Sequence, residues 1–461
     1  MKDAISPFQT GFEGKVLQAL FEGIDGAGLR YAVLRNYERL PHSVGARDID
    51  IVVHPDDLAA ACAVVKETVA RMRLRYGNYF ADERLTQFAL VGRDNAGGLL
   101  QIKIDFFVRS EVYGIEFLSA EEMLRDARGH NGISVVAEPV LLLDKWIFHL
   151  LVGRPLHPKY DADFAAIARA NGPALERKLS QLLSAQRAAE LVAGLAKGRG
   201  STLPVVPRAE RLRALSRLWA GQGVAAIPGS LRFLAFRLRD RLRPDGVFLS
   251  VSGPDGSGKT TVIDMVLAQM GAIYGEDALN YAHFRPTMLP RLAEVAQKAR
   301  AIESVDENYD QPHRAKPSGM AGSIARLIYY WLDYMGGYFR GVHPVLRRRE
   351  VMLFDRYYFD MIADSLRSRI VLPQPLMRIM GRLLPLPRYA FFLRVDPEEI
   401  HRRKQELTLD RIIELNDHYE DLVGRNWLIP IDNDGAPENA AAAIVDCIVA
   451  DRHAKAIRRL R

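Results

Sequence analysis

The chain has 461 residues, of which 48% are hydrophobic and 26% are charged. This composition is typical of a soluble globular protein, and the length exceeds one ordinary core, so we expect two or three domains. The net charge of +7 allows a polyanionic partner. Because the basic residues are spread along the chain, we favour substrate phosphates and general surface charge over nucleic acid.

The sequence shows none of the patterns expected of a membrane-spanning or a secreted protein. The longest apolar stretch, 140–152, is interrupted by Asp144, Lys145 and His149, so we expect no membrane span. The first twenty residues lack a basic segment followed by an apolar one, so we expect no secretory signal. The two cysteines lie far apart in the sequence and form neither a disulfide framework nor a zinc motif. We therefore expect a cytoplasmic protein.

Strands and helices alternate in the first part of the chain, residues 1–165. The runs at 31–34, 49–53 and 99–108 are typical of strands, and 55–71 is typical of a helix. The run at 49–53 follows Asp48, and Asp48 and Asp50 share one face of a strand because side chains alternate along it. Asp105 lies in the third run. Three carboxylates on neighbouring strands could hold divalent metal ions for phosphoryl or nucleotidyl transfer.

This pattern resembles the nucleotidyltransferase superfamily, whose core carries an acid-x-acid strand and a third acid on a neighbouring strand. The resemblance implies that Asp48, Asp50 and Asp105 bind metal. The chain departs from the superfamily where a Gly-Ser pair is usual, because it has Leu34-Arg35-Asn36-Tyr37 instead. The alternative is a solvent-facing strand on which two acids alternate without function.

The middle of the chain, residues 166–243, is rich in Ala, Leu and Arg and predicts helices. We expect breaks at 203–207 and at 227–229, where prolines occur. The segment 231–243 mixes apolar residues with arginines at helical spacing. This pattern fits a helix at a membrane surface, and it fits better an amphipathic helix that bridges two domains.

The last part, residues 244–461, contains a complete phosphate-binding loop. The apolar run 247–252 is followed by Gly253–Thr260, which matches G-x-x-x-x-G-K-T, and then by helical spacing from Thr261. Such a loop wraps its backbone N–H groups around a phosphate, Lys259 reaches the β- and γ-phosphates, and Thr260 binds Mg²⁺. The residues that we expect around ATP are Gly253, Asp255, Gly256, Ser257, Gly258, Lys259, Thr260 and Thr261.

Five apolar runs separated by long helical connections predict a parallel sheet in this part, with strands at 247–252, 279–284, 350–355, 389–395 and 428–432. A second motif in this part is Asp355-Arg356-Tyr357, which follows the apolar run 351–354. An acid at the end of a buried strand can bind Mg²⁺ or accept a proton from the acceptor. Arg356 can grip a phosphate with its planar guanidinium.

Together, these motifs resemble the thymidylate kinase family over about 245–455. The resemblance implies that Asp355 and Arg356 act at the phosphates and that Arg285, in His283-Phe284-Arg285-Pro286, contacts an acceptor phosphate. It also implies a basic lid over ATP, with Arg402 and Arg411 as its catalytic members and Arg403 and Lys404 as further candidates.

The acceptor region departs from that family, because 309–338 lacks its base-recognising pattern. The longer motif that runs from Asp355 to Asp360 resembles proteins of bacterial surface-polysaccharide gene sets. We therefore expect an ATP- and Mg²⁺-dependent kinase for a small-molecule or glycan acceptor. A nucleotide-gated binding or regulatory protein and an authentic thymidylate kinase remain as alternatives, and the oligomeric state stays open.

The expected fold class is α/β. It comprises an N-terminal α+β nucleotidyltransferase-like domain over 1–165, a helical segment over 166–243, and a parallel-sheet P-loop domain like that of nucleoside-monophosphate kinases over 244–461.

Overall fold

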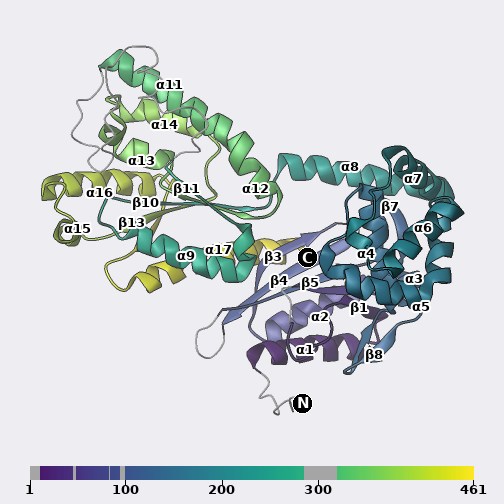
Figure 1. Cartoon of the computed structure of the whole chain (residues 1–461). Helices are drawn as coiled ribbons and strands as arrows, with labels where there is room; N and C mark the ends of the chain where they lie inside the picture. The colour runs from purple at the N-terminus through teal and green to yellow at the C-terminus, as the bar shows by residue number, and fades with distance from the viewer. Residues whose placement is uncertain (1–10, 45–47, 83, 94–98, 285–318, 461) are drawn as a thin grey trace. The chain divides into compact units, whose positions relative to one another are not determined.

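The computed structural model describes residues 11–44, 48–82, 84–93, 99–284 and 319–460. The chain divides into two compact units, one made of Met1–Leu238 with Arg452–Arg461 and one made of Arg239–Asp451 (Figure 1). The helical segment predicted between two domains is therefore not a unit of its own, because most of it belongs to the first unit. Within the described residues, no helix is long and apolar enough to cross a membrane.

The first unit contains a seven-stranded mixed sheet in the order β3-β4-β5-β2-β1-β9-β8. Its strands are β1 Tyr31–Arg35, β2 Asp48–Val53, β3 Arg75–Ala81, β4 Leu85–Arg93, β5 Leu99–Phe107, β8 Arg128–His130 and β9 Ile133–Val135. A separate hairpin is formed by β6 Arg109–Val112 and β7 Ile115–Ser119. The strand pair that matters for the site is β2 and β5, which run parallel with Asp50 opposite Asp105.

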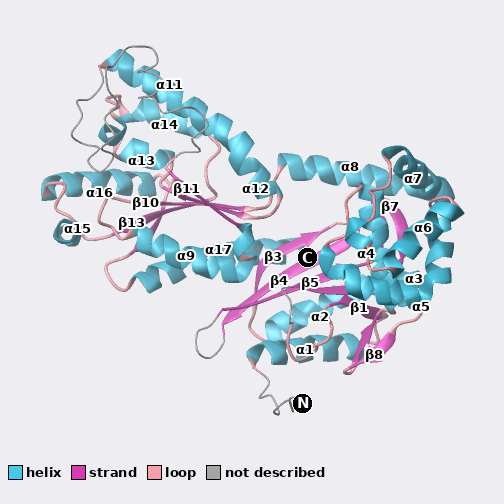
Figure 2. Cartoon of the chain, viewed as in Figure 1, coloured by secondary structure: helices cyan, strands magenta, loops and turns pink. Residues whose placement is uncertain are grey.

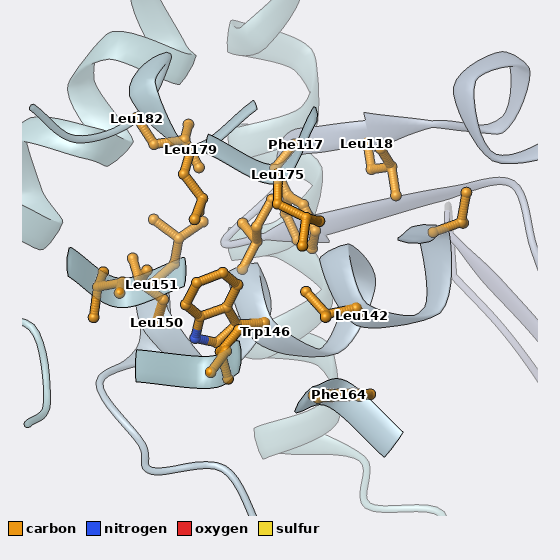
Figure 3. Packing of buried hydrophobic residues seen from close by; sticks show 14 of the residues in the cluster. Phe117, Leu118, Leu142, Trp146, Leu150, Leu151, Phe164, Leu175, Leu179 and Leu182 are labelled. Carbon is orange, nitrogen blue, oxygen red and sulfur yellow. The ribbon is translucent and has the colours of Figure 1, made fainter. Parts of the chain in front are cut away.

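Two hydrophobic clusters lie on the two faces of this sheet. Ile49, Ile51 and Val53 of β2 join one cluster with residues of α1 Phe12–Gly26 and α2 Leu58–Arg71. Val52 points the other way, into a cluster built largely from helices, around Trp146 (Figure 3). The helices that contribute to it are α3 Ala120–Leu124, α4 Glu138–Val152, α5 Asp161–Ser180, α6 Ala185–Ala196 and α7 Arg208–Gln222. Since side chains alternate along β2, Asp48 and Asp50 lie on this second face.

The predicted helices of the middle segment are present, but one of the two predicted breaks is wrong. The segment 203–207 does separate α6 from α7. Ile227-Pro228-Gly229 instead lies inside the first turn of α8 Ala226–Leu242. A proline is tolerated in the first turn because the N–H that it lacks would have no partner within the helix.

The second unit contains a five-stranded sheet in the order β11-β12-β10-β13-β14, and every neighbouring pair is parallel (Figure 2). Its strands are β10 Val247–Ser252, β11 Leu279–His283, β12 Val351–Asp355, β13 Tyr389–Arg394 and β14 Ile429–Asp432. All five predicted strands are confirmed to within about a residue at either end.

Helices connect these parallel strands, because parallel neighbours cannot be joined by a tight turn. They are α9 Lys259–Tyr274, α11 Met320–Gly337, α12 His343–Arg347, α13 Tyr358–Ala363, α14 Gln374–Arg382, α15 Pro397–Arg403 and α16 Leu409–Gly424, and α17 Pro437–Arg459 follows the last strand. A π-helical turn, Tyr338–Val342, joins α11 to α12. The carboxyl ends of β10, β11 and β12 lie level, since Val251 and His283 both pair with Asp355. Ligands of open parallel sheets bind at this edge.

Candidate nucleotide and metal sites

The phosphate-binding loop follows β10 at this edge and turns into α9. Its glycines take backbone conformations that other residues rarely adopt, with φ of +151° at Gly253, +91° at Gly256 and +80° at Gly258. Gly258 is the residue that precedes the first turn of α9, and Thr260 and Thr261 lie exposed in that turn. The backbone N–H groups at this helix start have no partner within the helix, which makes the loop a site for an anion.

Lys259 is buried beneath the loop. Its ammonium group donates hydrogen bonds to the carbonyl oxygens of Gly253 at 2.9 Å and Pro254 at 2.6 Å. Burial lowers the pKa of Lys259 to about 7, and Arg356 acts in the same direction, against the opposing effect of Asp255 and Asp355. A phosphate beside the ammonium group would favour its charged form, so this lysine is poised to gain charge when an anion binds.

Asp355 ends β12, next to the loop. Its Oδ2 lies 3.1 Å from Nδ1 of His283 and 3.4 Å from the hydroxyl of Tyr281. Its Oδ1 is buried and has no hydrogen-bond partner among the described residues. Burial would raise the pKa of Asp355, but the hydrogen bond from His283 and the charge of Lys259 outweigh it and lower the pKa. The group is thus a carboxylate with one oxygen left for a further ligand.

Arg356 is held by acids on two sides. Its Nη2 lies 2.5 Å from Oδ1 of Asp255 in the loop, and its Nη1 lies 3.5 Å from Oδ1 of Asp360. Asp255 also pairs with Arg367 at 2.5 Å. Burial would raise the pKa of Asp255, but these arginines and Lys259 outweigh it and lower the pKa. The residue Arg356 has φ of +71°, an uncommon value for a side chain of this size, and such strain is often found at functional sites.

The predicted lid residues divide into two groups. Arg402 and Arg411 pair with acids, Arg402 with Glu399 at 2.6 Å and Arg411 with Glu414 at 2.6 Å and Asp364 at 3.5 Å. Arg403 and Lys404 also pair with acids, at 2.7 Å from Glu399 and 3.2 Å from Glu406, but they lie close to the loop. A Cβ built on Gly256 would lie 3.2 Å from Cβ of Lys404, and one built on Gly258 would lie 3.8 Å from Nη1 of Arg403. The other predicted contact, Arg285, lies outside the described residues.

Three residues at this site went unrecognised as site residues in the sequence. Asn433 follows β14 and donates from its side chain to the carbonyl oxygen of Ser257 at 2.8 Å. Asp360 accepts hydrogen bonds from Ser252, Tyr357 and Tyr419. Arg367, the third, holds Asp255. Asn433 and Arg367 contact the loop from distant positions in the chain, where no local motif marks them. Asp360 lies four residues after Arg356, at the end of the motif that begins at Asp355.

In the first unit, the three predicted acids do converge. One carboxylate oxygen from each of Asp48, Asp50 and Asp105 lies within 4.8 Å of the others. Two basic side chains also lie at this cluster. Arg35 pairs with Asp50, and Nζ of Lys103 lies 3.7 Å from Asp48 and 3.5 Å from Asp105.

The cluster also has free ligand atoms. The Oδ1 atoms of Asp50 and Asp105 are buried and lack a hydrogen-bond partner in the part of the chain that the structure describes. Burial raises the pKa of Asp50 to about 7, with Asp48 and Asp105 adding to the shift and Arg35 opposing it. Buried carboxylate oxygens without partners are costly, and a divalent cation would satisfy them.

No family model and no curated protein matches this chain. Among solved structures, it is similar to the thymidylate kinase from Ehrlichia chaffeensis, with 16% sequence identity and a TM-score of 0.31. The match covers 45% of this chain and 99% of that one. The likeness is weak. It assigns no activity to this chain.

Proposed function

We propose that the chain is an ATP-dependent phosphotransferase whose second unit phosphorylates a small-molecule or glycan acceptor. The observation that carries the proposal is the meeting of Lys259, the start of α9 and the Asp355 carboxylate at one edge of the parallel sheet. A loop that binds triphosphate beside a strand-end acid is the minimum that phosphoryl transfer requires.

In this proposal the residues of the loop bind and orient ATP. The loop amides and Lys259 hold the β- and γ-phosphates, and Arg403 and Lys404 lie close enough to the loop to cover them. Thr260 and the free oxygen of Asp355 would hold Mg²⁺, which when bound neutralises charge on the phosphate oxygens. Arg356 stands beside the loop, where a guanidinium can stabilise charge on the transferred group.

Transfer forms a bond between an acceptor hydroxyl oxygen and the γ-phosphorus and breaks the bond between that phosphorus and the β–γ bridging oxygen, so that ADP leaves with the electron pair of that bond and the acceptor proton passes to solvent water. Asp355 supplies a carboxylate at the right edge to orient that hydroxyl. The acceptor is open in this proposal. A glycan is our preferred class because the motif that runs on to Asp360 resembles proteins of surface-polysaccharide gene sets.

An acceptor screen tests the proposal. The whole chain, with ATP and Mg²⁺, is offered sugars, sugar phosphates, oligosaccharides and nucleoside monophosphates, and ADP release is measured. We expect release that depends on one acceptor class and that falls about a hundredfold or more in Lys259→Ala. Lys197→Ala, an exposed lysine in the first unit, serves as the control and should keep full activity.

The other outcomes separate the alternatives. Saturable phosphorylation of thymidine monophosphate would identify a thymidylate kinase. ATP binding without stimulation by any acceptor would favour a nucleotide-gated binding or regulatory protein. Full activity of Lys259→Ala with the true acceptor would refute the proposed role of the loop.

We also propose that Asp48, Asp50 and Asp105 bind a divalent cation. Their convergence and the two partnerless oxygens support it. The missing Gly-Ser pair favours metal binding over nucleotidyl transfer, and a bound cation would compete with Arg35 and Lys103 for the three carboxylates. Without nucleotide, titration with Mn²⁺ should show a binding event that Asp50→Asn with Asp105→Asn removes and that the exposed Asp126→Asn leaves intact. Unchanged Mn²⁺ affinity in the double variant would make the cluster purely structural.

A further inference from the structure

Helix α8 has one face that is already packed and one that is not. On the packed face, Gly229 approaches the turn between β6 and β7 so closely that a Cβ on it would lie 2.4 Å from the carbonyl oxygen of Gly114. The ring of Phe233 lies 5.8 Å from that of Tyr113, and the ring of Phe236 lies 5.4 Å from that of Phe80. These contacts attach α8 (labelled in Figure 1) to the first unit through a single stripe of residues.

The opposite face carries a stripe of large apolar residues that remain exposed. Leu231, Leu234 and Leu238 are 61%, 64% and 57% exposed, and Ile227 and Leu242 continue the stripe at either end. At about 100° per residue these side chains lie opposite Gly229, Phe233 and Phe236. The contacts of the opposite face therefore hold the helix in place without this stripe. Single exposed leucines scattered over a surface need no explanation, whereas a continuous exposed apolar stripe indicates a binding surface.

Arginines follow both flanks of this apolar stripe. They are Arg232, Arg237, Arg239, Arg241 and Arg243. The one acid among residues 226–243 is Asp240, which faces Arg347 at 3.6 Å and Arg349 at 3.8 Å and so leaves the flanks basic. Leucines between two rows of arginines are complementary to a surface whose outer layer is negatively charged and whose inner layer is apolar.

We propose that α8 binds the surface of an anionic lipid bilayer, with Leu231, Leu234 and Leu238 inserted at the boundary of the acyl chains and the arginines on the lipid phosphates. The charge complementarity decides this choice of partner, because the basic flanks run on both sides of the stripe along the helix. Long arginine side chains extend to the phosphates while their stems cover apolar surface. The proposal concerns α8 alone and stands whether or not the second unit is a kinase.

Vesicle flotation tests the proposal with the whole chain. The vesicles contain phosphatidylcholine alone or with added phosphatidylglycerol. We expect binding only to the anionic vesicles, and less of it at high salt, because salt screens the arginines. Leu231→Asp with Leu234→Asp and Leu238→Asp should abolish it, since each carboxylate would have to enter an apolar layer. Arg239→Gln with Arg241→Gln and Arg243→Gln should weaken it on the order of a hundredfold at low salt.

The matched controls are variants with the same kinds of substitution at exposed positions outside α8. Leu376→Asp with Ile379→Asp and Leu383→Asp changes three exposed apolar residues of the second unit, and Arg125→Gln with Arg208→Gln and Arg213→Gln changes three exposed arginines of the first. Both should bind vesicles as the unchanged chain does, and circular dichroism should show that all variants are folded.

Three results would overturn the proposal. One is no binding of the unchanged chain to anionic vesicles. Another is an equal loss of binding in the matched controls. The third is a dimer in sedimentation that the leucine variant dissociates while vesicles bind nothing, which would assign the stripe to a second copy of the chain.

Discussion

At the scale of residues, the candidate nucleotide site includes one buried acid that does not itself face the loop. Asp360 is 1% exposed and accepts hydrogen bonds from the Ser252 hydroxyl at 2.6 Å and the Tyr419 hydroxyl at 2.8 Å. Its carboxylate also faces Arg356, which is 3% exposed. A buried guanidinium needs such a partner, because its charge has lost the solvation of water. Asp360 therefore positions Arg356 beside the loop.

Asp360→Ala should lower the free energy of unfolding of the second unit by about 3 kcal/mol, since it removes one of the two carboxylates beside the buried Arg356 and leaves two hydroxyls without their acceptor. Asp360→Asn keeps an acceptor oxygen and should cost less. Urea unfolding measures both, and the exposed Asp417→Ala serves as control, with a change within about 0.5 kcal/mol. Equal effects of Asp360→Ala and Asp417→Ala would show that the buried network does not stabilise the fold.

The candidate nucleotide site could be predicted from the sequence only where its residues are contiguous. Gly253–Thr261 is a continuous motif, and its strand–loop–helix context was visible in the apolar pattern. The supporting contacts join residues that are far apart: 108 positions separate Ser252 from Asp360, 112 separate Asp255 from Arg367, and 176 separate Ser257 from Asn433. Tertiary folding alone brings such pairs together, and one sequence carries no signal for them.

His453 gives the first unit a pH-dependent contact. Its Nδ1 accepts a hydrogen bond from the backbone N–H of Tyr76 at 3.0 Å, and its ring stacks on that of Tyr76. Burial, and after it the charge of Arg75, lowers the pKa of His453 below its ordinary 6.5. Between the lowered pKa and 6.5, the unfolded chain binds more protons than the folded chain. The stabilisation that the neutral His453 gives the fold is therefore fully present above pH 6.5, and it is lost as the pH falls from 6.5 through the lowered pKa.

Hydrogen exchange at the Tyr76 amide should therefore speed up as the pH falls below 6.5, beyond the intrinsic effect of pH. His453→Asn keeps an acceptor at the position of Nδ1 and should remove this step, while the exposed His42→Asn should retain it. Retention of the step in His453→Asn would assign it to another group.

At the scale of elements, the strands that the sequence marks most clearly are the fully buried ones of the second sheet. β10, β12 and β13 are continuous apolar runs because helices cover both faces of a parallel sheet, and they were predicted within about a residue. β3, whose sequence is RYGNYFA, and the short β8, RGH, were missed because polar residues and glycine interrupt the alternation. Pairing with neighbouring strands overrides these weak local preferences.

The attachment of α8 to the first unit depends on the lack of a side chain at Gly229. Gly229→Ala would place a Cβ against the backbone of Gly114, which cannot move aside as a flexible side chain can. We expect a cost of about 1–3 kcal/mol in the unfolding of the first unit. Gly221→Ala in α7 is the matched control, because nothing lies within 4 Å of its Cβ, and it should stabilise by about 0.5–1 kcal/mol. Equal effects of the two substitutions in thermal or urea unfolding would contradict the close approach.

At the scale of the whole molecule, the chain leaves the first unit at residue 238 and returns to it at residue 452. The second unit is thus an insertion in the sequence of the first. The returning segment is the last part of α17, where Ala456 is 1% exposed in the core of the first unit. Arg452 donates to the side chain of Asn78 at 3.0 Å, and Lys66 donates to the carbonyl oxygen of Leu460 at 2.6 Å. The sequence alone did not predict this return, because α17 shows no boundary signal at 452.

Deletion of residues 452–461 should therefore destabilise the first unit although the segment is joined to the second. Loss of the buried Ala456 and of the contacts of Arg452 and His453 should cost at least about 3 kcal/mol, because each contact leaves an opened core or a partnerless polar group behind. Hydrogen exchange, resolved by peptide, reports each unit separately. We expect faster exchange in β3 and α2 and unchanged exchange in β10 and α9, together with unchanged ATP affinity. Ala456→Asp places a charge in the same core and should reproduce the pattern without shortening the chain. Faster exchange confined to the second unit, or no change in either, would contradict the division of the chain at residue 452.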